Sequence, residues 1–191
     1  MHGTASRANA YDAPMLPREI ATAVPHCILR PWRLEDKASL IRHANNRNVS
    51  RHLLDRFPFP YTDADADRWL GIATAQGNDI HLAVEVDGEA AGGISAMRGS
   101  GNARFTAEIG YWLGEAHWGR GIATASVRAF CAAIFAHTDL ERIEAGAFAG
   151  NIASQRVLAK SGFTRFGVRE RYFHKDGAFI DDVMFALLRS R

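Results

Sequence analysis

The stretch that most constrains the fold of this chain is Glu108–Thr124, with the sequence EIGYWLGEAHWGRGIAT. Its first half reads as a β-strand, and its second half reads as a turn that leads into a helix, with glycines at Gly114, Gly119 and Gly121. Glycines let the backbone come close to a ligand, and the first turn of a helix offers unpaired N–H groups at the positive end of the helix dipole. Such a segment is suited to binding an anion such as a pyrophosphate.

Three alternatives fit a glycine-bearing strand–turn–helix segment. A Walker-type phosphate loop ends in Gly-Lys-Ser/Thr, and the segment has no such ending. A dinucleotide fingerprint starts almost directly after its strand and ends in glycine or alanine, whereas about five residues intervene here and Thr124 stands last. The third alternative is a turn whose glycines only allow tight packing, so the surrounding sequence has to decide between them.

The composition restricts the class of protein and its partners. The chain has 191 residues, 47% hydrophobic and 23% charged, which indicates one globular domain. Its net charge is only +2, with Lys and Arg spread along the chain, so we expect neither a nucleic-acid nor a membrane partner. No apolar run approaches the ~18 residues that span a bilayer, and the first residues lack a signal-peptide core, which favours a cytoplasmic location. Cys27 and Cys131 are isolated and the eight histidines form no ligand motif, so no metal site is predicted.

The chain is expected to form one folded domain after a short extension. Residues 1–25 are rich in Ala, Pro and small polar residues, which predicts a loosely attached, flexible extension, and residues 26–191 are expected to form the domain. Strands are predicted from Cys27 and over 80–86, 90–97 and 105–113, and the short turns between the last three indicate antiparallel pairing. Gly92 and Gly93 indicate a bulge or a close approach in the third of these strands.

The second half of the chain reads as a crossover followed by a helix and a hairpin. A helix predicted over 119–137 connects the strand over 105–113 to another over 142–148, which makes these two strands parallel. The buried side of this helix is expected to carry Ile122, Val127, Phe130 and Ile134. The remaining predicted elements are helices over 34–44, 63–75 and 151–161 and a terminal hairpin of strands over 166–173 and 179–188.

The segments around the glycine turn resemble the GCN5-related N-acetyltransferase (GNAT) superfamily. The acyl-CoA loop of that superfamily runs Gln/Arg-x-x-Gly-x-Gly/Ala, which maps onto residues 118–123, and only Trp118 departs from it. The loop binds through its backbone, so the resemblance tolerates this change. The chain also resembles the branch with the ribosomal-protein N-terminal acetyltransferases of the RimJ/RimL type. The segments that carry this resemblance are LRPW from Leu29 with ED at 35–36, FPFPYT from Phe57, EIGYWL from Glu108, HWGRGIAT from His117, NIASQRVLAKSGF from Asn151 and YFHKDG from Tyr172.

This resemblance implies a fold and a set of cofactor contacts. The implied fold is mixed α/β (α+β), with a mostly antiparallel seven-stranded sheet flanked by helices and a splayed parallel pair near 105–113 and 142–148. The pantetheine arm of acetyl-CoA is expected to enter the gap and bond the peptide groups of Trp112 and Leu113. Asn151 and Ser154, one helical turn apart, are expected to lie against CoA, with a helix cap as a compatible role for Asn151. The pyrophosphate is expected to bind the backbone amides of Trp118, Gly119, Arg120, Gly121, Ile122, Ala123 and Thr124.

The implied reaction is direct attack of a neutral amine on the acetyl thioester. At pH 7, neutralising an α-amine costs about 1.4 kcal/mol, against about 4.6 kcal/mol for a lysine amine, so an α-amine needs only a mild base. We predict Glu108 as this base, with an ordinary outward strand residue as the alternative, and the Leu113 N–H as the oxyanion donor. Many members of the superfamily carry a proton-donating tyrosine seven residues after the capping Asn151, where this chain has Leu158. Ser154 is the predicted substitute.

We therefore predict an acetyl-CoA-dependent N-acetyltransferase that acts on a primary amine, with a protein N-terminal α-amine as the first choice. The alternatives are a small-molecule acceptor, such as an amino acid, polyamine or antibiotic, and a non-catalytic CoA-binding or sensing module. Tyr111 and Tyr172 are looser candidates for assisting the leaving thiolate, or else packing aromatics. The helices over 34–44 and 63–75 and the last hairpin are expected to form the acceptor pocket. The sequence does not define the oligomeric state and leaves a dimer open.

Overall fold

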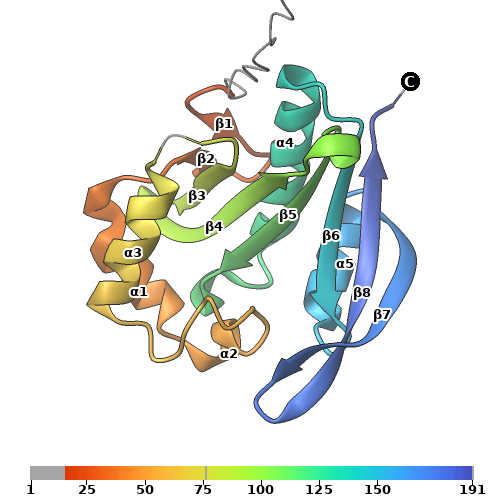
Figure 1. Ribbon diagram of the computed structural model, residues 1–191. Coiled ribbons are helices and arrows are strands. Elements are labelled where there is room, and N and C mark those ends of the chain that lie inside the picture. Colours follow the sequence, from red (N-terminus) through yellow and green to blue (C-terminus); the bar gives the residue numbers. More distant parts are fainter. Residues whose placement is uncertain (1–15, 76, 191) are drawn as a thin grey trace, which may run out of the picture.

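The computed structural model describes residues 16–75 and 77–190 and shows one sheet with helices on both faces (Figure 1). The sheet has eight strands in the order β1-β2-β3-β4-β5-β6-β8-β7. The strands are β1 Ile20–Ala21, β2 Cys27–Pro31, β3 Ile80–Val86, β4 Glu89–Arg98, β5 Thr106–Leu113, β6 Arg142–Phe148, β7 Thr164–Lys175 and β8 Ala178–Leu188. The helices are α1 Lys37–Ala44, α2 Arg47–Ser50, α3 Asp63–Ala73, α4 Ile122–His137 and α5 Ile152–Lys160, with short 3-10 turns at Leu34–Asp36, Gly101–Ala103 and Glu115–His117.

The expected mixed α/β fold and its parallel pair are confirmed, but the predicted number of strands is wrong. Seven strands were expected and the sheet has eight, because β1 adds an antiparallel pair to β2. β1 lies in the stretch assigned to the flexible extension, and its Ile20 side chain is buried in the core. A strand of two residues carries no alternating pattern, so its sequence gave no signal. The first 15 residues of the expected extension lie outside the described residues.

Helices cover the two faces of the sheet with separate apolar clusters. On one face, α4 packs Ile122, Val127, Phe130 and Ile134 against the main core, which confirms the predicted buried side of this helix. On the other face, α1 and α3 form a smaller cluster around Trp32. Because side chains alternate along a strand, β5 contributes to both clusters: three of its side chains are buried in the main core, Tyr111 packs against that core, and Trp112 packs on the second cluster. The main-core residues of β5 are Ala107, Ile109 and Leu113.

Gly92 and Gly93 of β4 lie beside a β-bulge and a close approach of the backbone, the two features that the sequence had indicated. The register shifts so that Val84 faces Gly92 while Glu85 faces Ala90, which leaves Ala91 as the extra residue of a bulge. At Gly92 the backbone of β5 comes close, because a Cβ atom there would lie 2.4 Å from the Trp112 carbonyl oxygen. The close approach requires glycine at this position.

We predict that Gly92→Ala lowers the free energy of unfolding by about 1–3 kcal/mol, because the added methyl group meets backbone that cannot rotate away. Urea unfolding measures the change. Gly110→Ala is the matched control, because Gly110 lies on the paired strand β5 with no atom within 4 Å of the position of its Cβ. Equal losses in the two variants would contradict the close approach.

Candidate active site

The site is organised around the point where β5 and β6 part. The parallel pairing covers only three positions, Thr106 with Arg142, Ala107 with Ile143, and Glu108 with Glu144. Both strands continue beyond these positions, and β6 remains paired with β8 over its whole length. A gap therefore opens between the last residues of β5 and of β6, as expected for the splayed pair.

The hydrogen bonds at the two ends of β5 show which peptide groups face this gap. The carbonyl of Thr106 accepts from the N–H of Gly99 at 2.9 Å, and the N–H of Gly114 donates to the carbonyl of Ala91 at 2.8 Å. Both bonds lie on the β4 side. Because backbone groups alternate in direction along a strand, the even-numbered residues of β5 pair with β4.

The odd-numbered residues of β5 are directed to β6 and, beyond the paired region, into the gap. At the start of the strand, the carbonyl of Phe105 accepts from the N–H of Arg142 at 3.2 Å on the β6 side. The same alternation turns the peptide groups of Tyr111 and the N–H of Leu113 into the gap. Trp112 directs its own peptide groups to β4. Of the two residues expected to meet pantetheine, only Leu113 directs its amide into the gap. Tyr111, which was not predicted to bind pantetheine, also directs its peptide groups there.

The tryptophan that departs from the family motif connects the turn to the end of β5. The indole N–H of Trp118 donates to the carbonyl of Leu113 at 2.7 Å, while 43% of the residue remains exposed. This bond uses the last carbonyl of the strand and leaves the Leu113 N–H for the gap. It also fixes the position of the loop that leads to α4.

The first turn of α4 presents free N–H groups, as the glycine-bearing segment predicted. Gly119 and Gly121 adopt φ values of 75° and 77°, a left-handed conformation that favours glycine, and Gly121 is the N-cap. The helix therefore begins at Ile122, three residues later than expected. Its first backbone bond runs from the N–H of Ala125 to the carbonyl of Gly121 at 3.0 Å, so the amides before it have no partner within the helix. They are the N–H groups of Ile122, Ala123 and Thr124.

The turn before α4 is held by side chains of the N-terminal half. Asn46 donates to the Glu115 carboxylate at 2.7 Å and Asn48 donates to it at 2.9 Å, and these bonds hold the pKa of Glu115 below its usual value. The ring of His43 lies 5.2 Å from that of His117. Burial, and then the charges of His43 and Arg120, lower the pKa of His117. These contacts hold the turn against α1 and α2.

The α5 side of the gap brings together two predicted residues and one looser candidate. The Asn151 Oδ1 atom accepts from the Ser154 N–H at 3.1 Å, so Asn151 is the N-cap of α5. The hydroxyl of Ser154 lies 2.8 Å from that of Tyr111, which reaches across from β5. Burial raises the pKa of Tyr111 to about 12. Leu158, which occupies the position of the family tyrosine, is fully buried in the main core.

Glu108 lies on the opposite face of the sheet from this hydroxyl pair. Its side chain is exposed and stands opposite Glu144 at the last paired position of β5 and β6. Arg169 on β7 interacts electrostatically with Glu108 and is held by Asp182, which is 1% exposed. Arg169 also lies over the Tyr172 ring, 3.8 Å from its centroid. The side chain of the predicted base is therefore exposed on the α1/α3 side of the sheet, and Ser154 lies on the α4/α5 side.

The last hairpin contacts residues 47–55, which comprise α2 and the turn after it and are called the α2 segment. The Lys175 ammonium group pairs with Asp55 at 2.9 Å, and Arg47 pairs with Asp176 at 2.6 Å. Figure 1 shows the turn of the β7–β8 hairpin at the same end of the molecule as α2. The hairpin thus contacts the α2 segment directly, and the acceptor pocket expected between the hairpin and the helices over 34–44 and 63–75 stays a prediction.

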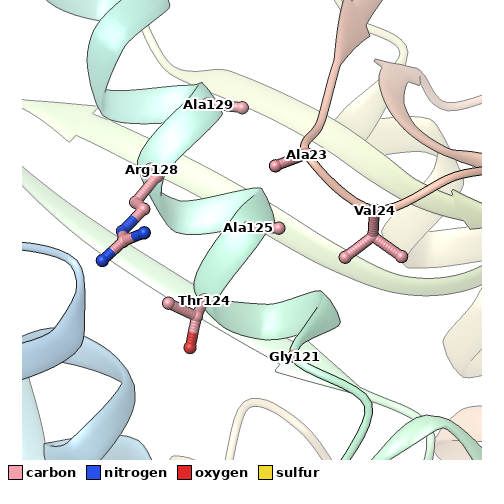
Figure 2. Close-up of a pocket in the computed structure, with 7 residues that line it drawn as sticks. All are labelled: Ala23, Val24, Gly121, Thr124, Ala125, Arg128 and Ala129. Atoms are coloured by element: carbon pink, nitrogen blue, oxygen red, sulfur yellow. The ribbon is translucent and has the colours of Figure 1, made fainter.

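A cavity of about 460 Å³ adjoins the start of α4 (Figure 2). Ala125 and Ala129 face Ala23 and Val24 of the loop that follows β1, and Gly121 closes one end of the cavity. The remaining lining residues are Thr124 and Arg128. The N-terminal segment thus forms one wall of a space beside the free amides of α4.

Comparison with known proteins gives the family. A model of the acetyltransferase (GNAT) domain matches residues 26–164, and the chain therefore belongs to this family. It is 30% identical to the uncharacterized N-acetyltransferase p20 of Bacillus licheniformis, over 84% of this chain and 92% of that protein. It is 41% identical to the probable N-acetyltransferase YjcK of Bacillus subtilis, over 44% of this chain and about half (46%) of that protein. The solved structure of Mycobacterium smegmatis RimJ in complex with CoA-disulfide has a TM-score of 0.76 and 28% identity, over 89% of this chain and 85% of that one.

Within residues 16–75 and 77–190, no group of three or more His, Cys, Asp and Glu side chains could hold a metal ion. None of the helices in this part has the length and apolarity needed to cross a membrane.

We predict that Asn151→Ala lowers the free energy of unfolding by about 0.5–2 kcal/mol, because the first turn of α5 loses its side-chain cap. Thermal or urea unfolding measures the loss. Asn151→Asp is the matched control, since a carboxylate oxygen can accept the same bond from the Ser154 N–H. The capping role would be wrong if the alanine variant were as stable as the aspartate variant.

Proposed function

We propose that this protein transfers an acetyl group from acetyl-CoA to a primary amine, with a protein N-terminal α-amine as the acceptor. The observation that carries the proposal is the gap between β5 and β6. There, Tyr111 and Leu113 direct peptide groups toward β6 at positions where no β6 residue pairs with them. An extended ligand that carries amides, such as pantetheine, pairs with such groups like an added strand.

The pyrophosphate of acetyl-CoA belongs at the start of α4 in this proposal. The Ile122–Thr124 amides and the helix dipole favour an anion there, and the left-handed glycines Gly119 and Gly121 keep the turn free of side chains. Trp118 and Arg120 frame the turn, and Arg120 is exposed and able to reach a phosphate oxygen. Without the gap and the family match, the start of α4 would indicate only an ordinary anion-binding site.

The other cofactor contacts come from α5. The Oδ1 atom of Asn151 is used in the helix cap, which leaves its Nδ2 donor for CoA. Ser154 lies one turn further along the same helix, with its hydroxyl at the gap. CoA lying between the start of α4 and the start of α5 would contact most of the cofactor-binding residues that the sequence suggested. The exceptions are the peptide groups of Trp112, which pair with β4, and the Trp118 N–H, which donates to the Glu115 carbonyl at 3.1 Å.

In this proposal the amine lies on the Glu108 face and the thioester lies in the gap. Glu108 or a water molecule bound to it removes a proton from the amine, and an α-amine needs only about 1.4 kcal/mol to become neutral at pH 7. The amine nitrogen attacks the acetyl carbon, and the N–H of Leu113 donates to the oxyanion that forms. The carbon–sulfur bond then breaks and CoA leaves.

The choice of acceptor rests on similarity to one branch of the family. The sequence resembles the ribosomal-protein N-terminal acetyltransferases of the RimJ/RimL type, and RimJ has a similar structure at 28% identity. The same core chemistry suits a small-molecule amine, because the fold does not fix the acceptor.

We predict that the protein binds acetyl-CoA in calorimetry and transfers labelled acetyl groups to peptides with free N-termini. The panel should contain N-terminal peptides, the same peptides with blocked N-termini and an internal lysine, and small amines such as polyamines. Transfer to small amines alone would overturn the N-terminal acceptor but keep the enzyme. Binding without transfer to any amine would favour a CoA-sensing module, and failure to bind CoA would overturn the whole proposal.

We predict that Glu108→Gln lowers kcat by about 10²–10⁴-fold, the range that a positioned general base contributes, while the Kd for acetyl-CoA stays unchanged. The kcat of the variant should recover in part as pH rises, since free hydroxide and neutral amine then replace the missing base. Glu144→Gln is the matched control, because Glu144 stands opposite on β6 but is paired with Arg142. Similar losses in both variants would show that the effect comes from local charge and not from a base at position 108.

A further inference from the structure

The α4/α5 side of the gap lacks the tyrosine that would assist the departing thiolate. Leu158 stands at that position and is 0% exposed inside the main core, so its side chain does not reach the gap. The leaving sulfur nevertheless acquires negative charge as the carbon–sulfur bond breaks. A donor is needed near the gap from another part of the chain.

Two hydroxyl groups meet at this place from opposite sides of the gap. Tyr111 extends from β5, on the face of Ala107 and Ile109, and its hydroxyl lies 2.8 Å from that of Ser154 on α5. The cap from Asn151 fixes the backbone N–H of Ser154 at 3.1 Å and therefore the direction of the first helical turn. The Tyr111–Ser154 contact therefore joins β5 to the first turn of α5.

We propose that Tyr111 is a positioning residue that orients the Ser154 hydroxyl toward the leaving sulfur of CoA, so that the pair stabilises the thiolate by hydrogen bonding. The inference rests on the proposed acetyl transfer and extends it to the leaving group. The two hydroxyls carry two hydrogens, and their mutual bond uses one of them. The phenol is the more acidic donor, so when Tyr111 donates to Ser154 Oγ, the hydrogen of Ser154 is available to the sulfur.

The backbone offers one competing acceptor for these hydrogens. The Ser154 carbonyl lies 3.2 Å from the Tyr111 hydroxyl, which is a longer contact than the 2.8 Å between the two hydroxyls. That carbonyl lies within α5, where the helix supplies its own N–H donors. A charged sulfur is the stronger acceptor and draws the hydrogen toward the gap.

The pair acts as a hydrogen-bond donor and not as a source of a proton. Burial raises the pKa of Tyr111 to about 12, whereas a thiol ionises near ~8.5, so full transfer from the phenol to the sulfur is uphill. In the balanced step the amine nitrogen forms the C–N bond and loses its proton through Glu108 or water. The electron pair of the C–S bond goes to the sulfur, and the thiolate takes its proton from water as CoA leaves.

The first test measures the thiol of bound CoA and needs no acceptor. The thiolate absorbs in the ultraviolet, so a pH titration of the CoA complex gives the pKa of the bound thiol. We expect Tyr111→Phe and Ser154→Ala each to raise this pKa by about one to two units relative to wild type. The acid dissociation constant of the bound thiol then falls about 10- to 100-fold, as expected for the loss of a hydrogen bond to a charged group. An unchanged pKa in both variants would overturn the proposal, whether or not an acceptor is known.

The second test uses the acetyl transfer itself and separates an effect on the leaving group from a structural effect. With acetyl-CoA, both single variants should lose about 10- to 100-fold in kcat, with little change in the Kd for the cofactor, and the double variant should lose no more than either one. With an analogue that has selenium in place of the thioester sulfur, the leaving group is more acidic and the losses should shrink to about threefold or less. Equal losses in kcat with acetyl-CoA and with the selenium analogue would mean that Tyr111 and Ser154 only support the structure of the gap.

A control variant and the behaviour of the wild-type protein separate this inference from the proposed function. Ser39→Ala removes a serine hydroxyl on α1, away from the gap, which donates to the Asp36 carbonyl at 2.8 Å. This variant should change neither the thiol pKa nor the selenium dependence. A wild-type protein that fails to bind CoA overturns the proposed function and this inference together. A wild-type protein with CoA bound and a normal thiol pKa overturns the inference alone.

Discussion

The end of the pairing between β5 and β6 is the constraint on which the rest of the site depends. The two strands share only three positions, after which β5 is held by β4 alone and β6 by β8 alone. Buried peptide groups are costly when unpaired, so a gap of this kind is stable only if other parts of the fold hold both strands in place and a ligand or water completes the bonds. The bulge at Ala91 and the α5 cap at Asn151 each fix the backbone on one side of it.

Much of this arrangement could be predicted from the sequence. Alternating apolar residues and turn residues predicted the ends of most strands to within two residues. The helical periodicity predicted the buried side of α4. The strand–helix–strand order of the predicted elements indicated the parallel pair, and the family resemblance supplied its splay. β1 was missed because two residues have no period, and the start of α4 was placed too early because left-handed glycines interrupt the helix in a way that spacing does not reveal.

The contacts within the site were harder to predict, because they join residues that are distant in sequence or whose direction depends on the register. Trp118 departs from the family motif, and its side chain connects the turn to the end of β5 by donating to the Leu113 carbonyl. The proximity of Tyr111 to Ser154 spans 43 positions and follows only from the way α5 is placed after β6. Trp112 was expected to face the gap, and the strand alternation gives that position to Tyr111 instead.

The ion pairs between the last hairpin and the α2 segment decide which contact between these parts responds first to salt. Lys175 with Asp55, and Arg47 with Asp176, join stretches of chain that are 120 and 129 positions apart in the sequence. Both partners of the Arg47 pair are about half exposed, whereas the Lys175 side chain is buried. Because salt screens exposed charges more than buried ones, rising ionic strength weakens the Arg47 contact before the Lys175 contact.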